Sequence, residues 1–241
     1  MDEEVLKGKT LLVVDDENDL RDIVASELEF MGAKVYQAEN ISVAQKLLQE
    51  HEVDLIISDI RMPGGTGVDL LDKVKSKGLK APPVILITGF ADITVEDAFN
   101  KGAEALINKP FKLDDLIKLV VRYTSPIDER FHETVDAQKT IRINDSSIEF
   151  GRGGLAVPIE ADRRIDVGEV VNFDFNLHKM HFTGQGICRW VRSIDHSAHR
   201  AVVGIEFLNL ENDTLRTFKD LFDGKYVVPY IPSPKAQSLN Q

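Results

Sequence analysis

Short apolar runs alternate with amphipathic stretches through the first half of the chain. Residues 10–14, 53–57 and 84–87 are apolar at nearly consecutive positions, which is typical of central strands in a parallel sheet covered on both faces. Residues 34–38 and 104–107 are weaker strand candidates. The pattern predicts five short strands in this half.

Helical periodicity fills the intervals between these runs. Leu20, Val24 and Leu28 recur at helical spacing, and Gly32 stands where a glycine ends a helix. Further amphipathic helices are expected around residues 43–48, 70–74, 92–100 and 113–121. Five strands, each followed by a helix, predict a doubly wound α/β domain with a five-stranded parallel sheet.

The pattern changes to strands and glycine-rich turns in the second half. Strands are expected at residues 140–144, 147–150, 155–157, 170–177, 181–191 and 201–207, and a helix at 212–222. They predict a small six-stranded antiparallel β-barrel with a C-terminal helix. The expected organisation is a domain at 1–124, a linker at 125–138, the barrel at 139–231 and a flexible tail at 232–241.

Charge and composition exclude several classes of protein. The 241 residues carry a net charge of −11, with 23 acidic and 15 basic side chains in 1–124 and 17 and 14 in the remainder. Neither half offers the broad basic surface that nucleic-acid binding needs. The acidic N-terminus, the lack of a long apolar run and the single cysteine, Cys188, predict a cytoplasmic protein without membrane insertion or an internal disulfide.

Polar side chains stand where the strands of the first domain end. Asp15 and Asp16 follow the first strand, Asp59 the third, Thr88 the fourth and Lys109 the fifth. Carboxyl ends of parallel strands share one rim, so these groups are expected to meet there. Clustered carboxylates repel, and Mg²⁺ is a cation that relieves such repulsion and bridges to phosphoryl groups.

Each of these residues also has an ordinary explanation. Asp16 could decorate a helix N-terminus, Asp59 could begin a turn, and Lys109 could be a solvated surface lysine. Their joint placement at the ends of separate strands favours a phosphoryl-transfer site, in which a carboxylate acts as nucleophile.

The first half resembles the receiver domain of bacterial two-component response regulators. The matching segments are residues 12–17, 59–63 with Gly67, 88–90 and 108–111, within a resemblance that covers about residues 7–124. The resemblance implies that Asp59 is the phosphoacceptor, that Thr88 is the switch hydroxyl and that Lys109 contacts the phosphoryl group. It assigns Mg²⁺ to Asp15, Asp16, Asp59 and the main-chain carbonyl of Arg61. It also implies a cis bond between Lys109 and Pro110.

One position departs from the receiver pattern. The family usually carries an aromatic residue three positions before the lysine, and here that position is Leu106. Since a leucine cannot follow the threonine as an aromatic ring does, we expect the transmission of the signal to differ. The phosphorylation chemistry is not expected to change.

The second half resembles a PilZ domain, a six-stranded barrel that commonly binds cyclic di-GMP. The matching text lies at residues 149–157, 165–171, 186–191 and 203–207, within about 127–223. The family's ligand motifs are incomplete here: alignment on Gly154 puts Glu149 at the Asp position and Gly151 at the Ser position. The resemblance therefore implies a degenerate PilZ-like domain, and cyclic di-GMP is not expected to bind.

Other polar side chains of this half have structural explanations. Arg122, Arg130 and Arg142 include no pair four apart, and the adjacent Arg163 and Arg164 are expected to face solvent. Trp190 is expected in the core, Cys188 as a small strand residue, and residues 151–154 as a hairpin turn. A metal site at His178, His181, His196 and His199 is not expected.

These observations predict a response regulator phosphorylated on Asp59 by a sensor histidine kinase or phosphotransfer protein. Its PilZ-like output domain is expected to bind an unknown protein target, without enzymatic activity beyond self-phosphorylation and slow autodephosphorylation. A homodimer is expected by family analogy, and nucleic acid is not an expected partner. The alternative is a phosphorylation-regulated cyclic di-GMP receptor that uses Arg130, Arg142 or Arg152.

Overall fold

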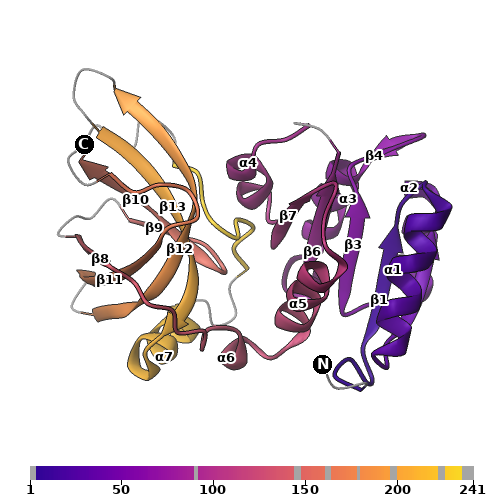
Figure 1. Ribbon diagram of the computed structural model, residues 1–241, viewed down its shortest axis with the longest axis horizontal. Helices are drawn as coiled ribbons and strands as arrows, with labels where there is room; N and C mark the ends of the chain where they lie inside the picture. The colour runs from indigo at the N-terminus through magenta and orange to yellow at the C-terminus, as the bar shows by residue number, and fades with distance from the viewer. Residues whose placement is uncertain are drawn as a thin grey trace. The chain divides into compact units, whose positions relative to one another are not determined.

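The chain forms two compact units. The computed structural model describes residues 4–89, 92–143, 148–160, 164–177, 180–195, 200–221 and 226–234 (Figure 1). The first unit comprises Met1–Thr94 and Lys101–Pro126, and the second comprises Val95–Asn100 and Ile127–Gln241. A short helix from the first half of the sequence therefore belongs to the second unit.

A five-stranded parallel sheet forms the centre of the first unit. Its strands are β1 (Thr10–Val14), β2 (Lys34–Ala38), β3 (Leu55–Asp59), β6 (Val84–Thr88) and β7 (Ala105–Asn108). They lie in the order β2-β1-β3-β6-β7, with every neighbouring pair parallel. All residues of β3 and β6 are buried, whereas β2 and β7 at the edges are partly exposed. The predicted doubly wound sheet is confirmed.

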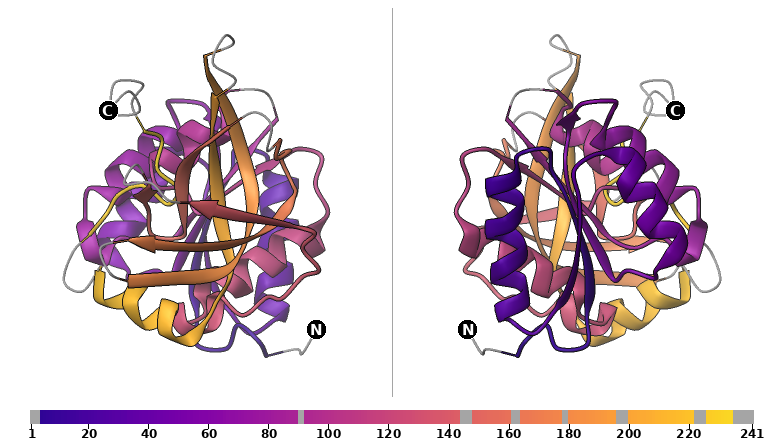
Figure 2. Two further views of the ribbon diagram at one scale, coloured as in Figure 1. Left: turned by 90° about the vertical axis from the view of Figure 1, so that its left-hand side faces the viewer. Right: turned by 90° about the vertical axis from the view of Figure 1, so that its right-hand side faces the viewer.

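Helices cover both faces of this sheet, with α1 on one side and α2 on the other (Figure 2). The helices of the unit are α1 (Asn18–Phe30), α2 (Ile41–Glu50), α3 (Gly67–Lys75) and α5 (Leu113–Thr124), with a 3-10 turn at Gly78–Lys80. Gly32 follows α1 at a φ of 92°, which confirms its predicted role as the residue that ends this helix. A short hairpin of β4 (Arg61–Met62) and β5 (Gly65–Thr66) was not expected from the pattern.

A six-stranded sheet forms the centre of the second unit. Its strands are β8 (Lys139–Ile143), β9 (Glu149–Phe150), β10 (Gly154–Glu160), β11 (Val170–Leu177), β12 (Met180–Asp195) and β13 (Arg200–Leu210). Helices α4 (Val95–Asn100), α6 (Ile127–Arg130) and α7 (Asn212–Leu221) complete the unit. Every predicted strand has a counterpart in this sheet.

The connectivity of this sheet differs from the expected antiparallel barrel. The order is β8-β11-β12-β13-β10-β9, and β8 pairs with β11 in parallel, so the sheet is mixed. Among the described residues the edge strands β8 and β9 do not pair with each other, and the sheet is open there. Alternation of apolar and polar residues identifies strands but not the direction of their partners, which explains the difference.

A cluster of aromatic side chains fills the core of the second unit. Its phenylalanines are Phe131, Phe173, Phe175, Phe182, Phe207 and Phe218. Phe131 comes from the expected linker and packs edge-on against Phe207, with ring centroids 5.9 Å apart. Trp190 and Cys188 are buried in β12, as predicted. Pro232 and Pro234, which the sequence indicates as part of a flexible tail, are also buried.

No helix among the described residues has the length and apolar character needed to span a membrane.

A buried ion pair joins α3 to the start of β7 in the first unit. The Lys75 Nζ atom lies 2.9 Å from Glu104 Oε2 and donates to the Pro82 carbonyl oxygen at 2.9 Å. Glu104 Oε2 also accepts from the Val84 main-chain N–H at 2.7 Å. Both side chains are almost fully buried. If one partner is removed, water therefore cannot solvate the charge of the other.

Replacement of Lys75 by methionine should therefore destabilise the fold by about 3–5 kcal/mol, because it leaves a buried carboxylate without its cation. The matched control is Lys101→Met, which breaks the exposed pair with Asp72 and should cost only about 0–1 kcal/mol. Urea unfolding of both variants measures the difference. Equal losses in the two variants would contradict the assigned role of the buried pair.

Candidate functional site

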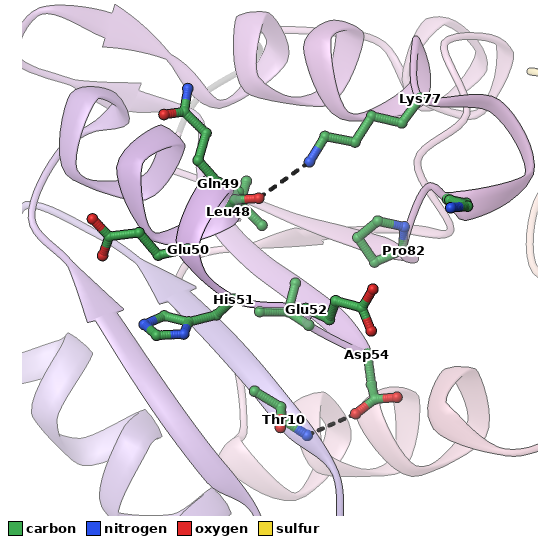
Figure 3. A pocket seen from close by; sticks show the side chains of 11 residues that line it. Thr10, Leu48, Gln49, Glu50, His51, Glu52, Asp54, Lys77 and Pro82 are labelled. Atoms are coloured by element: carbon green, nitrogen blue, oxygen red, sulfur yellow. Dashed lines mark hydrogen bonds between the residues drawn. The ribbon is translucent and has the colours of Figure 1, made fainter.

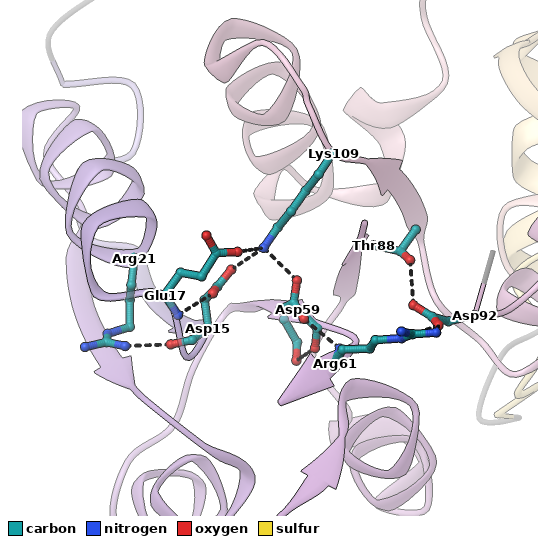
Figure 4. A network of polar contacts seen from close by, with 9 residues as sticks. Asp15, Glu17, Arg21, Asp59, Arg61, Thr88, Asp92 and Lys109 are labelled. Carbon is teal, nitrogen blue, oxygen red and sulfur yellow. Dashed lines mark hydrogen bonds and ion pairs between the residues drawn. The ribbon is translucent and has the colours of Figure 1, made fainter. Parts of the chain in front are cut away.

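Two buried carboxylates and one lysine meet at the carboxyl ends of the central strands (Figure 4). Asp15 directly follows β1 and Asp59 ends β3, and their residues are only 3% and 5% exposed. Lys109, which follows β7, places its Nζ atom 3.1 Å from Asp15 Oδ2 and 2.8 Å from Asp59 Oδ1. The structure therefore brings together three of the residues that the sequence placed at separate strand ends.

Glu17 is a further acidic partner of the lysine. Its Oε1 atom lies 2.8 Å from Lys109 Nζ, and its main-chain N–H donates to Asp15 Oδ1 at 2.8 Å. Sequence reasoning missed this role, although Glu17 belongs to the matching segment 12–17. An exposed glutamate ahead of a helix is too common to indicate a partner by itself.

The ionisation of the two central groups is coupled. Burial is the largest influence on Asp59 and raises its pKa, while the hydrogen bond from Lys109 acts in the opposite direction. Burial disfavours the charged form of Lys109, yet hydrogen bonds to Asp59, Glu17 and Asp15 leave its pKa above the ordinary value. Lys109 is therefore a permanent cation beside a carboxylate that ionises reluctantly.

A second chain of contacts leads from Asp59 to the end of β6. The Arg61 main-chain N–H donates to Asp59 Oδ2 at 2.6 Å, and its guanidinium lies 2.5 Å from Asp92 Oδ1. The Thr88 hydroxyl donates to Asp92 Oδ2 at 3.0 Å. Asp92 was not predicted as a site residue, because the sequence suggests only that it begins a helix.

Asp16 is the predicted site residue that stands outside these contacts. It is exposed, whereas Asp15 beside it is buried. Among the described residues, no three His, Cys, Asp or Glu side chains form a group that could hold a metal ion. Asp15 and Asp59 do supply the hard oxygen donors that Mg²⁺ takes, and Lys109 now provides the positive charge between them.

Three further features of the site bear on the sequence predictions. The Lys109–Pro110 peptide bond is cis, as the resemblance implies. Leu106 lies on the edge strand β7 and is partly exposed. Gly67 begins α3 so close to the end of β3 that a Cβ atom there would overlap the Asp59 carbonyl oxygen. This close approach explains a glycine at that position of the motif.

A hollow of about 770 Å³ lies at the opposite end of the sheet (Figure 3). Its lining includes the acidic Glu52 and Asp54 and the basic Lys77 and Lys80. Asp54 Oδ2 accepts from the Thr10 main-chain N–H at 2.7 Å, which ties it to the start of β1. The charges of this hollow are mixed, and the site chemistry described above lies at the other rim.

The arginines considered for a dinucleotide site in the second unit lie on separate elements of the chain. Arg130 ends α6, and the side chain of Arg142 lies outside the described residues. Arg152 Nε donates to the Val227 carbonyl oxygen at 2.9 Å. Arg164 is exposed and pairs with Asp166 at 2.9 Å, in line with its predicted solvent position, while Arg163 lies outside the described residues.

The second unit also contains the histidines considered as metal ligands and the single cysteine. His181 Nε2 lies 2.7 Å from Asp174 Oδ1. His178, His196 and His199 lie outside the described residues. Burial raises the pKa of the Cys188 thiol to about 11, so it is not a reactive thiolate at neutral pH.

Comparison with known proteins identifies the first half of the chain. Residues 11–121 match the model of the response regulator receiver domain. The phosphate regulon transcriptional regulatory protein PhoB of Pseudomonas aeruginosa is 35% identical over 127 residues, which are 50% of this chain and 55% of PhoB. The regulatory protein AtoC of Escherichia coli is 34% identical over 46% of this chain and 24% of its own length. The chain thus spans about half or less of these relatives.

A solved structure shows the same extent of similarity. The response regulator protein TrrA from Thermotoga maritima, in complex with Mg(2+)-BeF, is 32% identical, with a TM-score of 0.41 over 46% of this chain and 96% of TrrA. The family match spans the three residues of the strand-end cluster, Asp15, Asp59 and Lys109. The N-terminal half of this chain is a response regulator receiver domain.

Proposed function

We propose that the chain is a response regulator that accepts a phosphoryl group on Asp59 from a histidine kinase or phosphotransfer protein. The observation that carries this proposal is the buried Asp59 carboxylate, held 2.8 Å from Lys109 Nζ beside the second buried carboxylate of Asp15. A nucleophile and a fixed cation in a partly desolvated site are the elements that phosphoryl transfer requires.

The proposed reaction forms an aspartyl phosphate. An Asp59 oxygen attacks phosphorus, the bond between phosphorus and the donor's histidine nitrogen breaks, and the nitrogen keeps the electron pair. Lys109 stabilises the negative charge on the phosphoryl oxygens without giving up its proton, because its pKa is raised. Water then hydrolyses the aspartyl phosphate and regenerates the Asp59 carboxylate. We propose no catalytic activity beyond these two steps.

Mg²⁺ is the cofactor we propose for this site. Asp15 and Asp59 would hold the ion, with Asp16 and the main-chain carbonyl of Arg61 completing its protein ligands. Bound Mg²⁺ supplies positive charge that offsets the three carboxylates and the incoming phosphoryl oxygens. Lys109, Arg61 and Thr88 position the reacting groups around it.

The proposed switch acts on the Thr88 hydroxyl. In the described state this hydroxyl donates to Asp92. A phosphoryl group on Asp59 offers stronger, charged acceptors, so the hydroxyl would leave Asp92 and shift the populations of the loop that precedes α4. Since Leu106 has no ring to follow Thr88, we propose that this loop transmits the signal.

We propose that the second unit is a PilZ-like output domain that acts by binding a protein, in a cytoplasmic regulator that can form a homodimer. Support comes from Arg152, whose side chain is engaged by the carbonyl oxygens of Val227 and Val228. PhoB is named as a transcriptional regulator, whereas this chain's acidic composition leads us to propose no nucleic-acid partner.

The phosphoacceptor can be tested with a small-molecule phosphodonor and Mg²⁺. The wild-type chain should gain the mass of one phosphoryl group, and Asp59→Asn should gain none because the amide is not a nucleophile. The matched control is Asp54→Asn, which removes a carboxylate from the opposite rim and should leave modification intact. Intact-mass spectrometry measures all three proteins, and modification of Asp59→Asn would exclude Asp59 as the sole acceptor.

The raised pKa of Asp59 predicts a pH-dependent stability difference. The unfolded chain ionises Asp59 at its ordinary pKa, whereas the folded chain ionises it at higher pH, so wild-type stability declines as the pH rises through the folded value. Without Mg²⁺, Asp59→Asn should therefore be more stable than wild type at about pH 7, and the gain should vanish at about pH 3, below the ordinary pKa.

Urea unfolding at the two pH values gives this comparison. Asp16→Asn is the control, because the same change is made on an exposed carboxylate and should produce a smaller gain at neutral pH. A gain for Asp59→Asn that is equal at both pH values would argue against desolvation of Asp59.

Cyclic di-GMP binding separates the proposed output from its alternative. Isothermal titration of the full chain with the dinucleotide should show no binding at micromolar concentrations. If binding is observed and is lost in Arg152→Ala, the output domain is a dinucleotide receptor with a divergent site.

A further inference from the structure

A segment near the C-terminus follows α7 and lies along the glycine-rich turn before β10, with bends at Tyr230 and Ile231. We name residues 226–234 the C-terminal strap. The main-chain N–H groups of Arg152 and Gly153 donate to the carbonyl oxygens of Pro229 and Tyr230, both at 3.0 Å. These two main-chain bonds, donated by consecutive residues of the turn, attach the strap to it without extending the sheet.

The turn has the shape that the strap requires. A Cβ atom at Gly151 would overlap the Tyr230 carbonyl oxygen, and one at Gly153 would overlap the Tyr230 ring. Tyr230 is only 3% exposed and Ile231 is fully buried. The glycines that the sequence explains as hairpin residues therefore also make room for the strap.

Two polar side chains anchor the strap to the sheet. Arg152 donates to the Val227 and Val228 carbonyl oxygens at 2.9 and 3.3 Å, and its guanidinium lies within 6 Å of the Tyr226 and Tyr230 ring centres. The Tyr230 hydroxyl donates to the buried Glu206 Oε1 at 3.2 Å. These contacts fix both the main chain and an aromatic side chain, as a peptide-binding surface does.

Helix α4 holds the other side of the strap within the same unit. The Tyr230 N–H donates to the Phe99 carbonyl oxygen at 2.9 Å, and the Ser233 N–H donates to Asn100 Oδ1 at 3.0 Å. Glu96 Oε1 accepts from Arg192 at 2.6 Å and from the Ser233 hydroxyl at 2.5 Å. The main chain of Tyr230 therefore bonds to both elements: its N–H donates to α4, and its carbonyl oxygen accepts from the turn.

We propose that α4 and the 151–153 turn form a docking surface for a peptide segment with one buried aromatic residue, and that the C-terminal strap occupies it in cis. The partner that this surface fits in trans is a segment of the same chemistry, with a buried aromatic residue at the position of Tyr230. The strap and such a partner exclude each other, so the strap is a built-in competitor. This inference does not depend on phosphorylation of Asp59.

Hydrogen–deuterium exchange of the full chain tests the cis contact. Tyr230→Ala removes the ring, and Gly153→Ala displaces the ring without changing the sequence of the strap. Both variants should exchange faster than wild type at 95–100 and 226–234, while β11 and β12 keep their protection and so report an intact fold. Tyr230→Phe keeps the ring but loses the hydroxyl bond to Glu206, so its exchange at both segments should lie between wild type and Tyr230→Ala. Unprotected strap amides in wild type, or unchanged exchange at 95–100 in both variants, would overturn the proposal.

A labelled peptide with the sequence of residues 226–234 tests binding in trans. It should bind saturably to full-length Tyr230→Ala protein, whose own strap is weakened, and at least about tenfold more weakly to wild type, where the strap competes. The same peptide with alanine in place of the tyrosine should lose this binding. Equal affinity for the two proteins, or for the two peptides, would refute the shared surface.

Discussion

The burial of Asp59 beside a second buried carboxylate, Asp15, is the constraint on which the receiver site depends. Parallel strands bring their carboxyl ends to one rim, so two buried carboxylates from β1 and β3 must share a small volume. Lys109 stabilises this arrangement, because its ammonium group contacts both carboxylates. The cost of burying Asp59 as an ion is what makes the site receptive to additional positive charge.

The parts of this site that depend on the main chain could be predicted from the sequence. Strands buried on both faces leave a continuous apolar signal, and their ends fix Asp15, Asp59, Thr88 and Lys109 on one rim. Glu17 and Asp92 could not be predicted in the same way, because each reaches its partner from a loop by a side-chain conformation. No periodic pattern encodes such a reach. The exposure of Asp16 could not be predicted either, because it depends on the conformation of the turn after β1.

The second unit shows the same limit at the level of the sheet. Strand positions follow from local alternation, but the parallel pairing of β8 with β11 is set by contacts between residues far apart in the sequence. The turn at 151–154 is instructive for the same reason. Its glycines indicate a hairpin locally, yet Gly153 is required by a tyrosine almost eighty residues later, which no local rule connects to it.

The membership of α4 in the second unit limits how freely the two halves of this chain could be exchanged in evolution. Domain shuffling that joined the second unit to a different receiver would supply a new fourth helix. That helix would need side chains equivalent to Glu96 and Asn100 to accept from Ser233, and a main-chain carbonyl placed to meet Tyr230. A receiver and a second unit with this architecture should therefore be inherited together, with substitutions in the helix matched by substitutions near the C-terminus.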